Sequence, residues 1–277
     1  MTESKNGKQP QSPQRSQSQF FFVVSVASMF SVVAFLTAAP GAQRGDQPPT
    51  ARAASPIDLT GYWVSVVTED WRYRMATPRK GDYASVPLNA AARRAADAWD
   101  PAKDASDGNA CRSYGVGAIM RAAGRLHITW QDEETLKIES DAGTQTRLLR
   151  FDAAAQAPAG DGGWQGFSVA RWQPAGPQRR GGAGRGRGAP PPRGGSLKVV
   201  TTHMKAGYLR KNGVPYSESA SVTEYFDRHD EPNGDRWFTV TTIVEDPTYL
   251  DEPFITSSHF KKEPDGAKWH PTACAAG

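Results

Sequence analysis

The 277-residue chain contains only two cysteines, and the short motifs that mark many enzymes do not occur in it. Two cysteines are too few for a disulfide-dense mini-protein, and no CxxC or HxxxH spacing supplies zinc ligands. The sequence lacks G-x-S-x-G, P-loop, Rossmann and H-E-x-x-H motifs, which disfavours common hydrolases, nucleotide-binding proteins and metalloproteases. Composition excludes collagen, coiled coils and polytopic membrane proteins. We therefore expect one domain of about 200 residues with a substantial core and no metal or cofactor.

The chain also lacks an even distribution of charge. Lys plus Arg number 33 against 29 Asp plus Glu, which gives a net charge of +4 and a pI of about 9.1. Residues 1–53 carry +3 and residues 173–195 carry +5, so the other 201 residues carry −4. A basic pI often indicates a nucleic-acid partner, but the body predicted here is mildly acidic. We expect no nucleic-acid partner.

One long apolar run is present, residues 20–39, which have no charge and follow the polar, basic residues 1–19. This order is typical of an export signal, and the length also suits a single membrane-spanning helix. A cleaved signal and an uncleaved anchor are the alternatives. Both predict a periplasmic or secreted body that touches a membrane only through this segment, after a Pro/Gly/Gln-rich linker at residues 40–56.

The two cysteines, Cys111 and Cys274, are an even pair, which in an oxidising compartment predicts one disulfide. Because the enclosed loop is long, the bond would stabilise the fold by about 4–5 kcal/mol on the chain-entropy model. It would tie the carboxyl end to an irregular early segment. Two free thiols are the alternative, because sequence does not show proximity.

The body, residues 57–277, shows short β-branched and aromatic segments separated by turn residues such as Asn233-Gly234. One short helix is predicted, capped by Asn89 and ended before Pro101. So many strands favour an all-β, antiparallel closed barrel of about eight or nine strands, or a sandwich, because an open sheet would expose edges. The candidate strands are residues 61–68, 125–131, 135–140, 146–151, 166–172, 196–204, 220–228, 237–245 and 254–262.

An Arg/Gly/Pro-rich stretch at residues 173–195 interrupts this pattern. It holds eight Gly and five Pro, and such a composition does not bury a core. We predict a disordered loop inserted between two strands. Arg-Gly runs also bind RNA, but this one has no aromatic residue on which bases stack.

The first candidate strand opens with Asp58-Leu59-Thr60-Gly61-Tyr62-Trp63. Its G-x-W resembles the start of the first strand in lipocalins and related small barrels. That resemblance implies a calycin-type barrel whose Trp plugs one end and whose interior holds a small ligand. Lipocalins stack an Arg after the last strand on this Trp, whereas Lys261-Lys262 end the last strand here. Stretches such as TGYWVSVVTEDWRYRM also resemble a group of uncharacterised exported bacterial proteins, which implies no activity.

Trp71-Arg72-Tyr73-Arg74 is the densest aromatic and cationic stretch. If extended, it places the aromatics on one face and the arginines on the other, as at the lip of a barrel where Arg pairs with a ligand carboxylate or phosphate. The alternative is a strand with core aromatics and arginines paired to surface acids. The parity of its strand makes His127 a further candidate for ligand contact.

Three hypotheses for function follow. The leading one is an exported lipocalin-like barrel that binds a small, partly apolar ligand. The second is an isomerase, lyase or hydrolase that uses the same cavity, with His127, Glu224 or His259 as acid or base. Strand histidines also suit zinc, but three independent histidines are the commoner arrangement. The third is an envelope interaction module, which predicts a filled interior and an exposed apolar patch.

Overall fold

The computed structural model describes residues 48–152, 155, 157, 162–175 and 194–277. Residues 47–277 form a compact unit. The apolar segment 20–39 and residues 176–193 of the Arg/Gly/Pro-rich stretch lie outside the described residues, so those two predictions stay predictions. The ends of that stretch that are described belong to strands, because β5 continues to Pro174 and β6 begins at Gly195.

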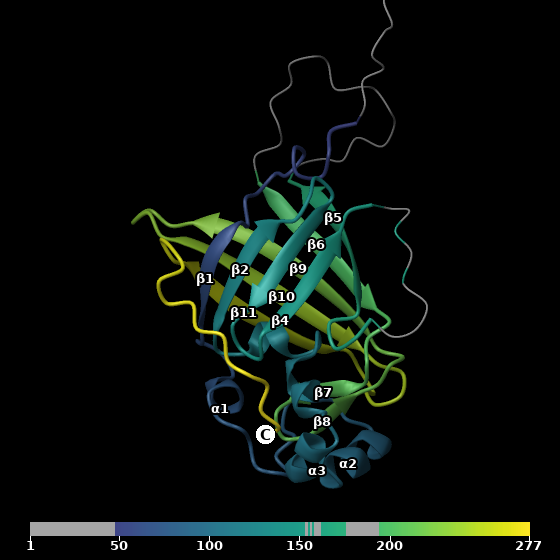
Figure 1. Cartoon of the computed structure of the whole chain (residues 1–277). Coiled ribbons are helices and arrows are strands. Elements are labelled where there is room, and N and C mark those ends of the chain that lie inside the picture. Colours follow the sequence, from purple (N-terminus) through teal and green to yellow (C-terminus); the bar gives the residue numbers. More distant parts are fainter. Residues whose placement is uncertain (1–47, 153–154, 156, 158–161, 176–193) are drawn as a thin grey trace, which may run out of the picture. The chain divides into compact units, whose positions relative to one another are not determined.

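The body is a closed β-barrel of nine strands in the order β1-β11-β10-β9-β6-β5-β4-β3-β2 (Figure 1). This confirms the predicted all-β barrel. The strands are β1 (Gly61–Val66), β2 (Arg125–Trp130), β3 (Thr135–Ser140), β4 (Gln145–Arg150), β5 (Phe167–Pro174), β6 (Gly195–Thr202), β9 (Ser221–Asp230), β10 (Arg236–Glu245) and β11 (Phe254–Lys262).

One strand pair departs from the antiparallel arrangement that we expected. Strands β4 and β5 pair in parallel, with Leu149 opposite Ser168 and Arg150 opposite Val169. Residue numbers rise together in both strands along these pairs, which join the end of β4 to the start of β5, so the two strands run in the same direction. A tight hairpin at this point would have given an antiparallel pair.

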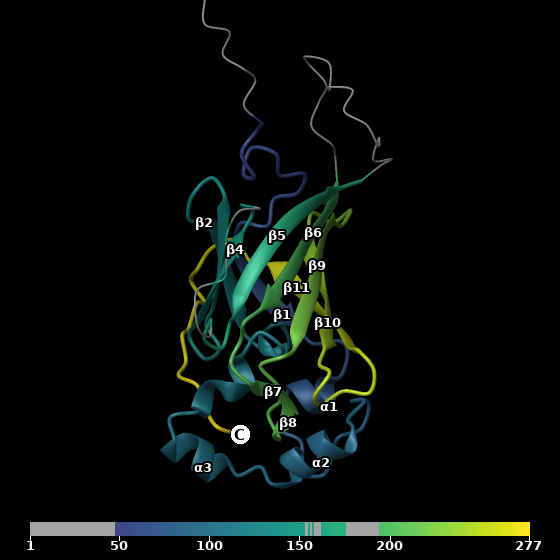
Figure 2. The ribbon, with the colours of Figure 1, turned by 90° about the vertical axis from the view of Figure 1, so that its right-hand side faces the viewer.

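The two ends of the barrel differ. The mouth, where β1 begins and β2 and β11 end, is crossed by residues 50–60. The opposite end, called the helical end, is covered by short helices and a hairpin (Figures 1 and 2). These are α1 (Trp71–Arg74), α2 (Ala90–Asp97), α3 (Pro101–Ser106), the 3-10 turns η1 (Ala110–Tyr114) and η2 (Ile119–Arg121), and the hairpin of β7 (Gly207–Arg210) and β8 (Val214–Tyr216).

Capping residues define the helices. Asn89 Oδ1 accepts a hydrogen bond from Ala92 N at 2.9 Å, as the sequence predicts for α2. The chain then turns at Ala98, and Asp100 caps α3, in which Pro101 is the first residue. Pro101 therefore starts a second helix that the sequence analysis missed, which is a favourable place for proline.

Large side chains of the neighbouring strands β1, β11 and β10 pack against one another inside the barrel. Trp63 meets Phe238 edge to face with ring centroids 4.8 Å apart, and Phe238 stacks on Phe260 at 4.7 Å. Nearer the helical end the interior holds a buried ion pair, in which Arg147 Nη2 lies 2.6 Å from Glu224 Oε2. The barrel core is therefore apolar toward the mouth and polar toward the helical end.

The carboxyl-terminal tail, residues 263–277, runs back along the outside of the barrel from the mouth to the helical end (Figure 1). Glu263 N donates to Tyr62 O at 2.9 Å, next to the end of β11. Farther along, Thr272 N donates to Asp141 O at 2.8 Å. The tail thus joins both ends of the molecule.

Candidate functional site

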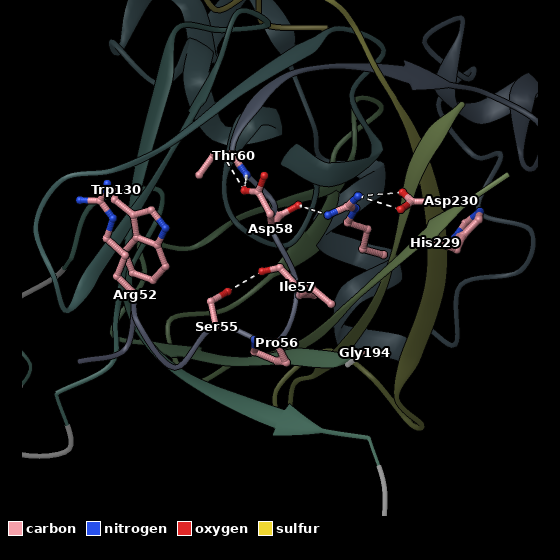
Figure 3. Close-up of a pocket in the computed structure, with 11 residues that line it drawn as sticks. Arg52, Ser55, Pro56, Ile57, Asp58, Thr60, Trp130, Gly194, His229 and Asp230 are labelled. Carbon is pink, nitrogen blue, oxygen red and sulfur yellow. Dashed lines mark hydrogen bonds and ion pairs between the residues drawn. The ribbon is translucent and has the colours of Figure 1, made fainter. Parts of the chain in front are cut away.

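A pocket of about 520 Å³ lies at the mouth, between the crossing segment 50–60 and the ends of β6 and β9 (Figure 3). The crossing segment is anchored because Ile57 and Leu59 are buried in the barrel core. Asp58, between them, lines the pocket. Trp130 and Arg228 line the pocket from the barrel itself.

Asp58 is the principal acceptor in this pocket. Its Oδ1 accepts from Thr60 N at 2.9 Å and from Thr60 Oγ1 at 2.7 Å. Partial burial acts to raise the pKa of this carboxyl, but the hydrogen bonds from Thr60 and the charges of Lys262 and Arg228 outweigh burial and lower the pKa. Asp58 is therefore ionised at neutral pH and suits a ligand hydroxyl or N–H.

Arg228 is the principal donor. Its Nη2 donates to both carboxylate oxygens of Asp230, at 2.8 and 2.9 Å, and its Nη1 donates to Asp58 O at 3.3 Å. Its Nε is buried and has no hydrogen-bond partner among the described residues. Protein atoms cover this Nε, so a ligand acceptor in the pocket would contact the part of the Arg228 side chain that stays exposed, 18% of it.

An aromatic cluster supplies a flat apolar surface at the mouth. Trp130, Phe151 and Trp172 have ring centroids 5.0 to 6.4 Å apart. Trp172 Nε1 donates to Ala51 O at 2.8 Å and so fastens the crossing segment to the end of β5. The cluster exposes Trp130 to the pocket.

Lys262 occupies the place that the lipocalin resemblance gives to an arginine. Its Nζ lies 5.3 Å from the ring centroid of Trp63 and donates to Thr60 O at 2.9 Å. Gly61, with φ of 107°, brings its backbone close to Lys262 Cε, which lies 3.1 Å from where a Cβ would stand. A lysine, in place of the arginine that the resemblance implies, therefore stacks on the buried indole of Trp63.

The predicted segment Trp71–Arg74 lies at the helical end and not beside this pocket (Figure 1). The segment is one helical turn, so its alternation does not place aromatics and arginines on opposite faces of a strand. The extended interpretation is wrong because Asp70 is left-handed, with φ of 50°, and Met75 N closes the turn by donating to Trp71 O at 2.9 Å.

The four side chains of this turn separate into two groups. Trp71 and Arg72 point to solvent, and Arg72 pairs with Asp82. Tyr73 and Arg74 face inward, where Arg74 Nε donates to Arg121 O at 2.9 Å. Of the five residues predicted to contact a ligand, the structure therefore brings only Tyr73 and Arg74 together, because His127 lies on β2.

The three candidate acid–base residues do not converge. His127 is on the outer face of β2, stacked on Tyr62 with ring centroids 4.1 Å apart. His259 is on the outer face of β11, where Nδ1 lies 3.0 Å from Thr239 Oγ1. Glu224 is inside the barrel, fully buried against Arg147. Within the described part of the chain, no three His, Cys, Asp or Glu side chains form a metal site.

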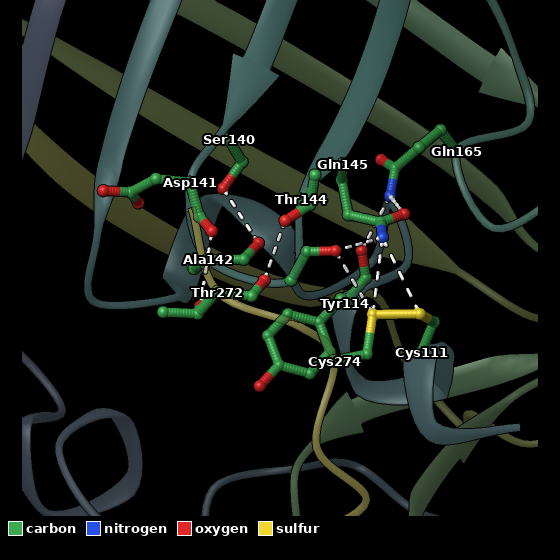
Figure 4. Close-up of a disulfide and its surroundings, with 11 residues drawn as sticks. Cys111, Tyr114, Ser140, Asp141, Ala142, Thr144, Gln145, Gln165, Thr272 and Cys274 are labelled. Carbon is green, nitrogen blue, oxygen red and sulfur yellow. Dashed lines mark hydrogen bonds between the residues drawn. A yellow bond between two sulfur atoms is a disulfide. The ribbon is translucent and has the colours of Figure 1, made fainter. Parts of the chain in front are cut away.

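Cys111 and Cys274 form a disulfide with Cα atoms 5.0 Å apart (Figure 4). The bond joins η1 to the carboxyl-terminal tail, as the sequence analysis predicts. Gln145 Nε2 lies 3.4 Å from Cys274 Sγ and donates to Gly143 O at 2.7 Å. The loop between the two cysteines contains most of the barrel strands. The disulfide therefore holds the carboxyl-terminal tail against η1 at the helical end.

Sequence reasoning missed the residues that line the mouth pocket. Arg228 carried a usable signal, because it continues the inward parity of Glu224 and Phe226 to the end of its strand. Asp58 lies three residues before the G-x-W motif, and nothing in that motif predicts a ligand contact for it. Trp130 similarly continues the inward parity of β2.

Comparison of the chain with protein-family models, curated proteins and solved structures finds no significant match to any of them. Among the described residues, no helix is both long and apolar enough to cross a membrane.

Proposed function

We propose that this protein is an exported, lipocalin-like binding protein that holds a small, partly apolar ligand at the mouth of its barrel. The observation that carries the proposal is the pocket of about 520 Å³, which falls in the size range of small-molecule sites. The ligand is a flat aromatic molecule with a donor for Asp58 and an acceptor for Arg228.

Export is part of the proposal. It is supported by the uncharged residues 20–39 behind a basic head, and by the disulfide, since such bonds persist in oxidising compartments. The lipocalin likeness is supported by the closed barrel and by the cation that stacks on Trp63.

The packing of the interior refines the ligand hypothesis. A lipocalin-like ligand would enter the barrel, but here buried side chains from all nine barrel strands form one core cluster inside it. A filled interior also matches the interaction-module hypothesis, as do the exposed side chains of Trp71 and Met75. We favour ligand binding because that hypothesis alone explains a pocket with paired donor and acceptor groups. The enzyme hypothesis, with His127, Glu224 or His259 as acid or base, gains no support from their placement, because no two of them meet in one pocket.

The test uses the full chain and 2-naphthol, a flat aromatic probe whose hydroxyl both donates and accepts. Binding near Trp130 predicts saturable quenching of Trp emission. The methyl ether of the probe, 2-methoxynaphthalene, lacks the donor and should bind about tenfold more weakly, because hydrogen bonds to charged groups contribute about 1.5–3 kcal/mol.

The variant Arg228→Met removes the guanidinium donor at the pocket and should weaken 2-naphthol binding by about tenfold or more. The matched control is Arg236→Met, because Arg236 is an exposed arginine on the neighbouring strand, outside the pocket lining. Equal quenching by 2-naphthol in both variants, or no saturation in the unmodified protein, would refute the proposal.

A further inference from the structure

Buried arginines gather at the helical end of the barrel, away from the mouth. Arg74, Arg121 and Arg210 belong to α1, η2 and β7 and are each less than a tenth exposed. Together with Tyr73 and Lys211 they line a cavity of about 30 Å³. Guanidinium groups stay protonated in proteins, so three positive charges are held in a region from which water is largely excluded.

Arg74 is satisfied within the protein. Its Nε donates to Arg121 O at 2.9 Å and its Nη2 donates to Ser65 Oγ at 3.0 Å. Its Nη1 pairs with Glu69. This arginine therefore needs no further partner.

Arg121 and Arg210 are only partly satisfied. Arg121 Nη2 lies 3.1 Å from Asp70 Oδ2, but its Nη1 is buried with no hydrogen-bond partner among the described residues. Arg210 Nη1 donates to Ala84 O at 2.7 Å, whereas its Nε and Nη2 are buried and unpartnered within the same described part of the chain. Both side chains line the cavity.

The charges around the cavity do not balance. Glu69 and Asp70 pair with Arg74 and Arg121, but no described carboxylate lies within ion-pair distance of Arg210. Arg210 instead stacks on the Tyr73 ring, 4.0 Å from its centroid. Burial, and after it the charge of Arg121, lower the pKa of Arg210, and the charges of Asp70 and Asp82, which lie beyond ion-pair distance, do not offset this. A buried charge of this kind is costly unless a counter-ion is present.

We infer that this cavity binds a small monovalent inorganic anion of the halide class, held by the unpartnered N–H groups of Arg121 and Arg210. The site neutralises the excess positive charge and supplies acceptors to donors that otherwise have none. A volume of about 30 Å³ holds one or two water-sized species, which suits chloride and excludes phosphate and organic acids.

The test compares thermal unfolding of the full chain in sodium chloride and in sodium gluconate at equal ionic strength, because gluconate is too large to enter. A ligand that binds the folded state alone raises Tm as its concentration rises. We expect Tm to be higher in chloride, by about 5 °C at a hundredfold excess over Kd for a domain of this size. Equal Tm values in the two salts would overturn the inference.

Three variants locate the effect. Arg210→Met removes the unpaired charge and should abolish the difference between chloride and gluconate. Ala122→Val keeps both arginines but fills the cavity that Ala122 lines, and should abolish the difference as well. Arg72→Met is the control, because Arg72 is on the same helix as Arg74 but points to solvent, and it should keep the full difference. A chloride effect that persists in Arg210→Met would contradict the inference.

A direct readout remains if Arg210→Met does not fold. The ³⁵Cl resonance broadens when chloride exchanges with a protein site, and bromide should remove this broadening by competition while gluconate should not. The unmodified protein should show more broadening than Ala122→Val. Equal broadening in the two proteins, or no competition by bromide, would show that chloride associates only with the surface.

Discussion

The two ends of the barrel are closed in different ways and leave spaces of different size. One stretch of chain, residues 50–60, crosses the mouth and leaves a pocket of about 520 Å³. Helices, a hairpin and a disulfide close the helical end, where Arg121 and Arg210 line a cavity of about 30 Å³ and a separate surface hollow of about 440 Å³ lies beside Val86 and Phe254. The mouth pocket therefore has room for an organic molecule, whereas the arginine-lined cavity has room for a single small ion.

Removal of the disulfide should have the largest effect on stability. The sequence separation of Cys111 and Cys274 is 163 residues, so the variant Cys111→Ser/Cys274→Ser should lose about 4–5 kcal/mol of unfolding free energy on the chain-entropy model. Urea unfolding measures the loss. Because the bond fixes the helical end, 2-naphthol should still bind the folded variant. Loss of binding in the folded variant would show that the two ends are coupled.

Disruption of the buried Arg147–Glu224 ion pair should have the second-largest effect on stability. Glu224→Leu leaves the Arg147 charge without a partner inside the barrel and should cost about 3–5 kcal/mol. Adding Arg147→Met should restore most of the loss, because both charges are then gone. Urea unfolding of the single and double variants measures this. A double variant as unstable as the single one would indicate a role for Arg147 beyond this pair.

The fastening of the crossing segment should have a smaller effect. Trp172→Phe keeps an aromatic ring in the cluster but removes the hydrogen bond to Ala51 O, so it should cost about 1 kcal/mol. We expect 2-naphthol to bind more weakly, because the segment that carries Asp58 is less firmly held. Unchanged affinity would mean that Ile57 and Leu59 alone position this segment.

Tyr216→Phe should have the smallest effect at neutral pH. The Tyr216 hydroxyl is buried and has no partner among the described residues, so its removal should stabilise the protein by up to about 1 kcal/mol. Burial raises the pKa of Tyr216. Its hydroxyl therefore stays protonated in the folded protein, whereas in the unfolded chain it ionises above pH of about 10. Stability should therefore fall above that pH, and less steeply in Tyr216→Phe. Equal slopes in urea unfolding at alkaline pH would argue against a buried hydroxyl.

Tyr208 should contribute to the same alkaline loss. Burial, and then its hydrogen bond to Asp104, raise the pKa of Tyr208 to about 12. The folded state thus binds a proton that the unfolded state has released between pH of about 10 and 12, so its contribution is complete below that window and lost through it. Tyr208→Phe should flatten the slope that remains in Tyr216→Phe.

The barrel was predictable because each strand has a local sequence signal, its composition. The strands β9, β10 and β11 are rich in β-branched and aromatic residues, and Asn89 lies three residues before Ala92, whose N–H it caps. The parallel pairing of β4 and β5 was not predictable, because no local turn signal sets the direction in which β5 pairs with β4.

The candidate sites were harder to predict because they are assembled from distant parts of the chain. Trp71–Arg74 alternates like a strand, and only the left-handed Asp70 makes it a helical turn. Arg121 and Arg210 meet through tertiary packing, since both stand over Phe254. The spacing of Arg121, Arg210 and Phe254 in the sequence does not predict that they lie close together.

The most direct test of ligand binding at the mouth is a spectrum of the Trp indole N–H groups during titration with 2-naphthol, with signals assigned by Trp→Phe substitution. We predict shifts for Trp130 and Trp172, at the mouth, and none for Trp71 and Trp99, at the helical end. Shifts at Trp71 or Trp99 with unchanged Trp130 would contradict ligand binding at the mouth.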